Sequence, residues 1–422
     1  MKLTKLFFTA IILAGGSFFP SQNSIAQDST SHSTSVEAQL QELTQQVKIL
    51  QRLRELDQEA AAQKLQAPSS STIGQPRFSG VVYGDYFYNI ARDTSGTKGP
   101  ALPNTAIPAA GNAKNFNGFQ LRRFYLTFDD DVTEKIATRF RFEDDQIAAV
   151  GGANTLFIKD AYVTWKGIFS GSDLTFGEQP TQALALSEAA WGYRSLDKTE
   201  QDLRGYVTTR DLGLSLRGRI DGEGKYNYSF LIGNNSNTGV ETDKYKRYYL
   251  TLQASPLTNF QIALAGDYAA LAPTKAAIGD NDKATVSLVA WYGVKESYNI
   301  GAEAFSQNYT NGFTPKTGAV TGSTESIVAQ GYSIFGSYNF SSEFAAILRY
   351  DIFDPNTGSA DNAKGDSRNY LIAGVSWKAD KNFFLQPNIQ YETYEQKPAS
   401  GAAPAISYDA SLTARLTVAY QF

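Results

Sequence analysis

The chain ends with Ser411-Leu412-Thr413-Ala414-Arg415-Leu416-Thr417-Val418-Ala419-Tyr420-Gln421-Phe422, a stretch in which apolar and polar side chains alternate. Every residue of even number is apolar, and every residue of odd number except Ala419 is polar. This period of two is typical of a β-strand with one apolar face and one polar face. As the edge of a soluble sheet, so long an apolar strand would favour aggregation. In a closed transmembrane barrel the last strand pairs with the first and lipid covers the apolar face, so the stretch predicts such a barrel.

The same alternation continues from Arg77 to the end of the chain and predicts an all-β fold, a transmembrane antiparallel barrel of about sixteen strands. Strands of roughly 9–11 residues span a bilayer when they are tilted. Short connections such as 129–134 alternate with long ones such as 180–206, as in barrels with short periplasmic turns and long external loops. The predicted strands are Gly80–Ile90, Phe119–Phe128, Lys135–Asp144, Leu156–Lys166, Ser172–Gln179, Val207–Ile220, Lys225–Gly233, Tyr245–Ala254, Phe260–Ala269, Ala284–Gly293, Tyr298–Asn308, Ala329–Phe340, Phe344–Phe353, Arg368–Lys378, Asn382–Thr393 and Tyr408–Phe422.

The composition excludes several classes of protein. The mean hydropathy of −0.31 does not fit a bundle of membrane-spanning helices. The chain has no cysteine for disulfides or thiolate metal sites. Its only histidine, His32, lies in a Ser/Thr-rich stretch, which removes the usual base of hydrolytic catalysis. We therefore expect no enzyme activity, no metal, no cofactor and no nucleic-acid partner.

The amino-terminal residues 1–26 have the features of a signal peptide. Lys2 and Lys5 precede the apolar run 6–16, and the small residues Ser24 and Ala26 precede the expected cleavage site. The apolar run is too short for a spanning helix. Together with the barrel, this segment predicts the outer membrane of a Gram-negative bacterium, with the amino-terminal part of the mature chain in the periplasm.

Residues 27–66 are predicted to form a Ser/Thr-rich segment followed by a short α-helical coiled coil in the periplasm, and residues 67–76 a linker to the barrel domain 77–422. Apolar residues at alternating spacings of four and three favour a coiled coil that supports a homotrimer: Val36, Leu40, Leu43, Val47 and Leu50. An amphipathic helix on the barrel, or a tether that binds the cell wall or another partner, remains the alternative.

If the apolar positions of each strand face lipid, the opposite positions face the lumen. An arginine or lysine that faced lipid at mid-bilayer would cost about 2–4 kcal/mol, so the lumen is the favourable place for the strand arginines. Guanidinium groups there would favour anions, although Glu143, Asp160 and Asp351 could offset them as ordinary salt-bridge partners. Lys159, Arg122 and Arg210 fall on the lipid-facing positions and are expected at the headgroup rim. The candidate pore-lining residues are Arg123, Arg139, Arg141, Arg217, Arg219, Arg247, Arg349 and Arg415.

The long connection 180–206 is unusually apolar for a loop in water, with Leu184, Leu186 and Trp191 close together. We expect it to fold into the barrel and narrow the pore; packing against a neighbouring subunit or capping of the rim is the alternative. Its candidate constriction residues are Glu188, Arg194, Lys198 and Arg204.

Three stretches resemble the phosphate-selective porin O/P family of outer-membrane porins: Gly118-Phe119-Gln120-Leu121-Arg122-Arg123-Phe124-Tyr125-Leu126-Thr127-Phe128, Phe157-Ile158-Lys159-Asp160-Ala161-Tyr162-Val163-Thr164-Trp165 and Phe176-Gly177-Glu178-Gln179-Pro180. The terminal aromatic Phe422 is similar to the last residue of bacterial outer-membrane barrels. The resemblance implies a sixteen-stranded trimeric porin with an inward third loop, in which some members select phosphate through an arginine ladder and a lysine cluster. Arg123, Arg139 and Arg141 match such a ladder, whereas the lysines of the candidate loops are scattered: Lys198, Lys244 and Lys246.

These observations favour an outer-membrane porin for passive diffusion of small hydrophilic solutes, with anions such as phosphate as the expected class. The alternatives are a general or cation-tolerant porin, and an outer-membrane anchor that uses the coiled coil as a tether.

Overall fold

The computed structural model describes residues 73–93, 114–145, 155–273, 280–313, 325–358, 366–399 and 404–422. The predicted signal peptide, the coiled coil and most of the linker lie outside these residues. In the described parts of the chain, no helix is both long and apolar enough to cross a membrane.

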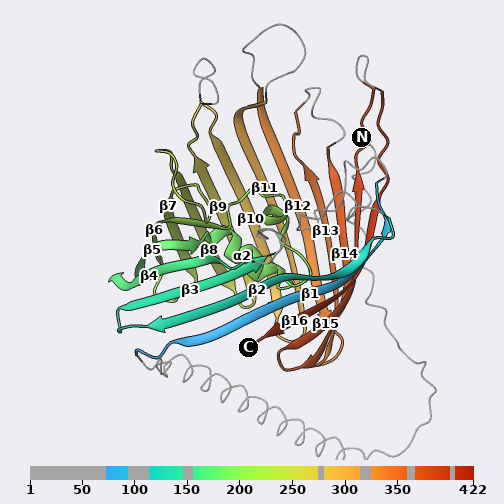
Figure 1. Ribbon diagram of the computed structural model, residues 1–422. Helices are drawn as coiled ribbons and strands as arrows, with labels where there is room; N and C mark the ends of the chain where they lie inside the picture. The colour runs from blue at the N-terminus through green and yellow to red at the C-terminus, as the bar shows by residue number, and fades with distance from the viewer. Residues whose placement is uncertain are drawn as a thin grey trace, which may run out of the picture. The chain divides into compact units, whose positions relative to one another are not determined.

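Sixteen antiparallel strands form a closed barrel in which each strand pairs with its neighbours in sequence and β1 pairs with β16 (Figure 1). The predicted all-β barrel is confirmed, and strand ends differ from the prediction by a few residues. The strands are β1 Arg77–Ala91, β2 Asn117–Asp131, β3 Ile136–Asp145, β4 Phe157–Phe169, β5 Ser172–Pro180, β6 Arg210–Arg219, β7 Tyr226–Gly233, β8 Arg247–Leu257, β9 Phe260–Ala269, β10 Lys283–Val294, β11 Tyr298–Phe313, β12 Glu325–Asn339, β13 Phe344–Asp354, β14 Arg368–Asp380, β15 Phe383–Tyr394 and β16 Ser411–Gln421.

The barrel closes at the last residue of the chain. Gly80 and Phe422 exchange two backbone hydrogen bonds, with nitrogen-to-oxygen distances of 2.9 and 3.0 Å. The ring of Phe422 lies where a side chain at position 80 would be, since a Cβ atom built on Gly80 would approach a ring carbon to 2.2 Å. The same ring contacts Phe78, with centroids 5.6 Å apart. The terminal aromatic therefore packs on the seam between the first and last strands.

The wall alternates as the sequence predicts. Along β13, Leu348, Tyr350 and Ile352 are exposed on the outer surface, whereas Arg349 and Asp351 are buried on the inner side. Large apolar side chains outside and polar ones inside reverse the arrangement of a soluble domain and require an apolar environment around the barrel.

Two β-bulges overturn one expectation about charge. The pairing of β1 with β2 skips Arg122, and the pairing of β3 with β4 skips Lys159. A bulge adds one residue to a strand and so changes which face the next side chain takes. Arg122 and Lys159 are buried and form ion pairs with Asp85 and Glu143, respectively. The prediction that these residues lie at the headgroup rim is wrong.

Arg210, the third basic residue expected at the rim, is also buried. It opens β6, and its Nε atom lies 2.5 Å from a carboxylate oxygen of Asp160. The pairing of β5 with β6 is regular, so this residue needs no bulge to reach the acid.

The connection between β5 and β6, residues 181–209, contains two helices, α2 (Gln182–Trp191) and α3 (Glu200–Leu203). We call it the crossing loop. α2 ends at Gly192, whose φ of 73° is the left-handed value that favours glycine. The predicted loop 180–206 therefore exists with nearly the expected bounds.

Gly177 sits near the end of β5, just before the crossing loop. Its φ is +129°, and a Cβ atom there would lie 2.2 Å from the backbone oxygen of Ala161. Only glycine fits this backbone without a shift of β4 or β5.

We expect Gly177→Ala to destabilise the barrel by about 1–3 kcal/mol, because the new methyl group collides with backbone rather than with a movable side chain. Urea unfolding of the purified protein measures the change. Gly222→Ala is the matched control, since a Cβ atom at Gly222 meets no atom within 4 Å. Equal unfolding midpoints for the two variants would contradict this account of Gly177.

Candidate functional site

The crossing loop lies inside the barrel and is bound to strands on its far side. The side-chain amide of Asn299 in β11 donates to the backbone oxygen of Ala190, with a distance of 2.7 Å. Ser195 donates to Gln386 in β15 over 2.7 Å. Bonds to strands so distant in sequence fix the loop across the lumen (Figure 1).

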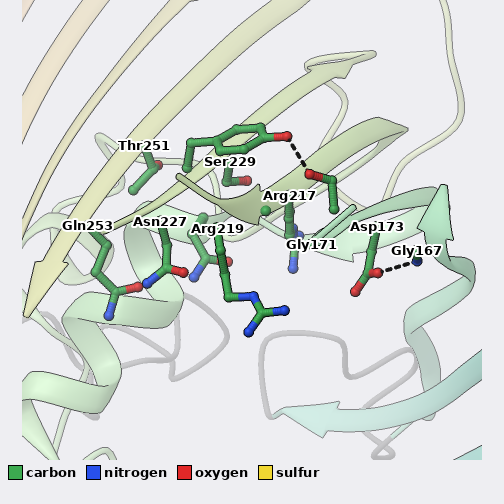
Figure 2. A pocket seen from close by; sticks show the side chains of 13 residues that line it. Gly167, Gly171, Asp173, Arg217, Arg219, Asn227, Ser229, Thr251 and Gln253 are labelled. Atoms are coloured by element: carbon green, nitrogen blue, oxygen red, sulfur yellow. Dashed lines mark hydrogen bonds between the residues drawn. The ribbon is translucent and has the colours of Figure 1, made fainter. Parts of the chain in front are cut away.

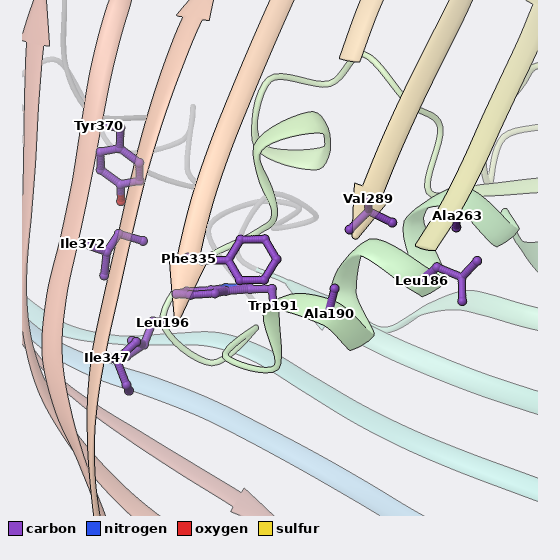
Figure 3. Packing of buried hydrophobic residues seen from close by; sticks show 10 residues of the cluster. All are labelled: Leu186, Ala190, Trp191, Leu196, Ala263, Val289, Phe335, Ile347, Tyr370 and Ile372. Atoms are coloured by element: carbon purple, nitrogen blue, oxygen red, sulfur yellow. The ribbon is translucent and has the colours of Figure 1, made fainter. Parts of the chain in front are cut away.

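One face of the loop covers an apolar part of the inner wall (Figure 3). Trp191 packs against Phe335 of β12, with ring centroids 5.6 Å apart. The buried cluster joins loop residues to inward residues of β9, β10 and β12 to β14: Leu186, Ala190, Trp191, Leu196, Ala263, Val289, Phe335, Ile347, Tyr370 and Ile372. Burial of apolar surface thus holds the loop on this side of the barrel.

The carboxylate of Glu303 in β11 fastens both helical parts of the loop. It accepts a hydrogen bond from the Ser187 hydroxyl in α2. It also accepts two bonds from Gln201 in α3, from the backbone nitrogen at 3.1 Å and from the side chain at 3.0 Å. Glu303 is buried and forms no ion pair with any described residue. These three donors are therefore the described hydrogen-bond partners of its carboxyl oxygens.

A second set of polar contacts ties α3 to β13 and β15. Arg349 of β13 lies 3.6 Å from the carboxylate of Glu200 in α3 and forms a two-pronged pair with Asp351 of its own strand, at 2.9 and 2.6 Å. Arg204 joins Glu200 and Glu392, each at 3.0 Å. Arginine forks of this kind give orientation as well as energy.

Two loop acids differ in their electrostatic surroundings. Burial raises the pKa of Glu200 well above its ordinary value and Asp351 raises it further, against the lowering effect of Arg204. Burial would also raise the pKa of Asp197, yet Arg415 and the hydrogen bond from Tyr370 hold it below its ordinary value. Asp197 therefore carries its negative charge more readily than Glu200.

Most of the predicted pore-lining arginines are paired with acids. These pairs join Arg123 to Glu143 at 3.0 Å, Arg139 to Asp129 at 2.6 Å, Arg141 to Asp160 at 3.4 Å and Arg247 to Asp267 at 2.6 Å, besides the pair of Arg349 with Asp351 described above. A paired arginine adds little net field to a lumen. The carboxylates thus neutralise much of the predicted arginine wall.

The three other arginines have different surroundings. Arg415 is buried 4.0 Å from Asp85, and none of its guanidinium nitrogens has a hydrogen-bond partner among the described residues. Among the residues that the structure describes, the Arg217 side chain donates only to neutral groups, the side chain of Gln179 and the backbone of Pro180. The side chain of Arg219 makes no hydrogen bond or ion pair with the described residues, and the residue is exposed at the end of β6.

Three of the predicted constriction residues lie together on the loop. Arg194 pairs with Glu188 at 2.9 Å and with Asp202 at 3.0 Å. Lys198 lies 4.0 Å from Asp202 and is partly exposed. The fourth residue, Arg204, is held in the buried network described above.

Two polar cavities lie beside the crossing loop, both against the wall of β2 to β8. The long-loop cavity, of about 680 Å³, is lined by Arg123, Lys159, Arg194, Lys198 and Asp202 together with neutral residues. The short-turn cavity, of about 640 Å³, is lined by Arg217, Arg219 and Asp173 together with neutral residues, as Figure 2 shows. Six basic residues thus line the two cavities against two acidic ones.

The acids and amides that hold the loop, among them Glu303, Asp197 and Gln386, were not predicted from the sequence. Glu303 stands at an inward-facing position of a strand that is otherwise rich in small and apolar residues. This is the one signal in the sequence that points to it. Nothing local in the sequence connects it to Ser187, which is 116 positions away.

Comparison with known proteins gives the fold. No protein-family model and no curated protein matches the sequence. Among solved structures, the outer membrane channel DcaP of Acinetobacter baumannii aligns with a TM-score of 0.58 and 14% identity, over 84% of this chain and 99% of that chain.

Two further structures show the same likeness. The anion-selective porin from Comamonas acidovorans has a TM-score of 0.55 and 12% identity, over 82% of this chain and 99% of that one. The trimer form of OmpT, an outer membrane protein of Vibrio cholerae, has a TM-score of 0.50 and 10% identity, over 83% and 100%. The chain has the barrel fold of outer-membrane porins and channels.

Proposed function

We propose that the protein is an outer-membrane porin that lets small hydrophilic solutes diffuse passively and prefers anions. The observation that carries the proposal is the excess of basic over acidic residues in the two cavities beside the crossing loop, which remains when the ion-pair partners Glu143 and Glu188 are counted among the acids. The passage runs between this loop and the wall of β2 to β8. On the opposite side the loop packs on the wall through the buried apolar cluster.

The charge of the passage, rather than that of the whole lumen, sets the preference. Arginines that are paired in the buried networks cancel against their acids. Arg217 and Arg219, in contrast, line the short-turn cavity without an acidic ion-pair partner among the described residues, and Lys198 lies 4.0 Å from its acid, Asp202. A pore bordered by residual positive charge concentrates anions and lowers the entry of cations. Phosphate belongs to the expected class of solutes, although the cavities hold no dense lysine cluster.

The outer membrane is the setting that this barrel requires, since its outer surface carries large apolar side chains that only lipid would cover. A homotrimer is the proposed assembly, with support from the fold shared with an outer membrane protein solved in a trimer form. The signal peptide 1–26 and the coiled-coil segment within 27–66 complete the proposal, the first for export and the second for trimer support or a link to the cell wall.

Reversal potentials of the purified protein in a planar bilayer under a KCl gradient test the preference. We expect the wild type to be anion-selective. Lys198→Glu should lower the anion-to-cation permeability ratio about threefold, because it reverses one charge beside the long-loop cavity.

Lys381→Glu makes the same charge change in the exposed β14–β15 turn and serves as the control. A cation-selective wild type, or an equal effect of both variants, would contradict the proposed anion preference. A folded protein with no conductance would contradict the channel itself and favour the tether.

The loop contacts give a second prediction. Glu303→Ala removes the acceptor for Ser187 and Gln201, so we expect a mobile loop, with larger and noisier single-channel conductance than the wild type. Glu303→Gln keeps one acceptor oxygen and should lie between the two. Identical single-channel traces for all three proteins would show that Glu303 does not hold the loop.

A further inference from the structure

The short-turn cavity has an ordered arrangement of polar side chains that the proposed general passage does not require. Three neighbouring strands, β6, β7 and β8, each contribute two inward residues (Figure 2). In the observed register, Arg219 pairs with Asn227, which pairs with Gln253. One step along the strands, Arg217 pairs with Ser229, which pairs with Thr251.

Each row therefore begins with an arginine and continues with uncharged hydrogen-bonding groups. Neighbouring strands lie about 4.8 Å apart, so a row of three extends across roughly 10 Å. This length matches an extended six-carbon chain. The cavity volume of about 640 Å³ is also in the range of small-molecule sites.

Arg219 is held in place by its stem rather than by a partner for its charge. A Cβ atom on Gly224 would lie 3.2 Å from its Cδ atom, and one on Gly171 would lie 3.6 Å from its Nε atom. Both glycines have positive φ values in the turns on either side. The stem thus packs between two turns, and the guanidinium group extends into the cavity, where Figure 2 shows it.

The neutral groups of the rows are oriented in a similar way. Asn227 donates its amide to the backbone oxygen of Gly224 over 2.9 Å, which leaves its carbonyl oxygen to accept. Gln253 donates to Gln261 over 2.9 Å, with the same result. The hydroxyls of Ser229 and Thr251 have no partner among the described residues. Such acceptors and hydroxyls match a ligand that carries several hydroxyl groups.

One acid limits the charge of the ligand. Asp173 lines the same cavity and accepts a hydrogen bond from the backbone nitrogen of Gly167 at 2.8 Å. A dianion such as a phosphate ester would be repelled by this carboxylate more than a monoanion. A ligand with a single carboxylate can place this group at the arginine end of a row, where the arginine balances its one negative charge.

We propose that the short-turn cavity is a binding subsite for polyhydroxylated monocarboxylates, that is, sugar acids. The carboxylate binds Arg219 and Arg217, and the hydroxyl groups bind the amides and hydroxyls of β7 and β8. The subsite rests on the proposed function for its access, because solutes reach it through the passage beside the crossing loop.

Calorimetric titration of the detergent-purified full-length protein with three six-carbon probes tests this assignment. Gluconate carries both the carboxylate and the hydroxyls, hexanoate only the carboxylate and sorbitol only the hydroxyls. We expect gluconate to bind at least about tenfold more tightly than either of the others. Equal or absent binding of all three would overturn the subsite.

Two variants separate the contribution of the carboxylate contact from that of the hydroxyl contacts. Arg219→Gln should remove the advantage of gluconate over sorbitol, and Asn227→Val with Gln253→Leu should remove its advantage over hexanoate. Arg77→Gln removes a charge at the same end of the barrel, away from the cavity, and should leave all three titrations unchanged. A loss of gluconate binding in Arg77→Gln as large as that in Arg219→Gln would overturn the assignment.

Bilayer conductance, measured beside the titrations, distinguishes a failure of the subsite from a failure of the proposed function. If the protein conducts chloride but binds gluconate no more tightly than hexanoate or sorbitol, the subsite is overturned and the porin function stands. Gluconate binding by a protein without conductance would support the subsite and overturn the porin.

Discussion

Burial of the apolar inner wall under the crossing loop is the constraint on which the rest of the lumen depends. The inward positions of β9 to β14 include Val289, Phe335 and Ile347, which a water-filled lumen would leave exposed. The loop supplies Leu186 and Trp191 to cover them, so the apolar surface is removed from water on both sides. The position of the loop, and with it the position of the proposed passage, follows from this packing.

The apolar cluster sets the position of the crossing loop, and the polar contacts set its orientation. Glu303 holds the two helices at a defined separation, and the Arg349 and Arg204 networks join α3 to the wall. These buried pairs add orientation more than net stability, because removing charges from water offsets much of their attraction. In these networks Arg349 and Arg204 are matched by Asp351, Glu200 and Glu392, so neither arginine is left without an acidic partner. The groups that remain beside the cavities therefore decide the field that a solute meets.

The sequence predicts much of the wall and little of the interior. The period of two in stretches such as 411–422 was sufficient for the strand number, because each strand repeats the pattern independently. It was not sufficient at Arg122 and Lys159, where one extra residue in a bulge changes the face of a side chain without any change in composition. The apolar content of residues 180–206 predicted that the loop leaves water.

The partners of the loop could not be predicted in the same way. Ser187 meets Glu303 across 116 positions of the chain, and Ser195 meets Gln386 across 191. Such contacts depend on the closed barrel and on the register of its strands, which no local pattern encodes. The same holds for the rows at the short-turn cavity, since Arg219, Asn227 and Gln253 become neighbours only through the pairing of β6, β7 and β8.

Accessibility of single cysteines tests most directly whether the passage lies between the crossing loop and the wall of β2 to β8. The chain has no cysteine of its own, so each introduced thiol is unique. Gln253→Cys places the thiol at the short-turn cavity, and Ile347→Cys places it under the loop. We expect a charged, membrane-impermeant thiosulfonate reagent to change the conductance of Gln253→Cys and to leave that of Ile347→Cys unchanged. Rapid modification of Ile347→Cys with no effect at position 253 would place the passage on the opposite side and contradict the account.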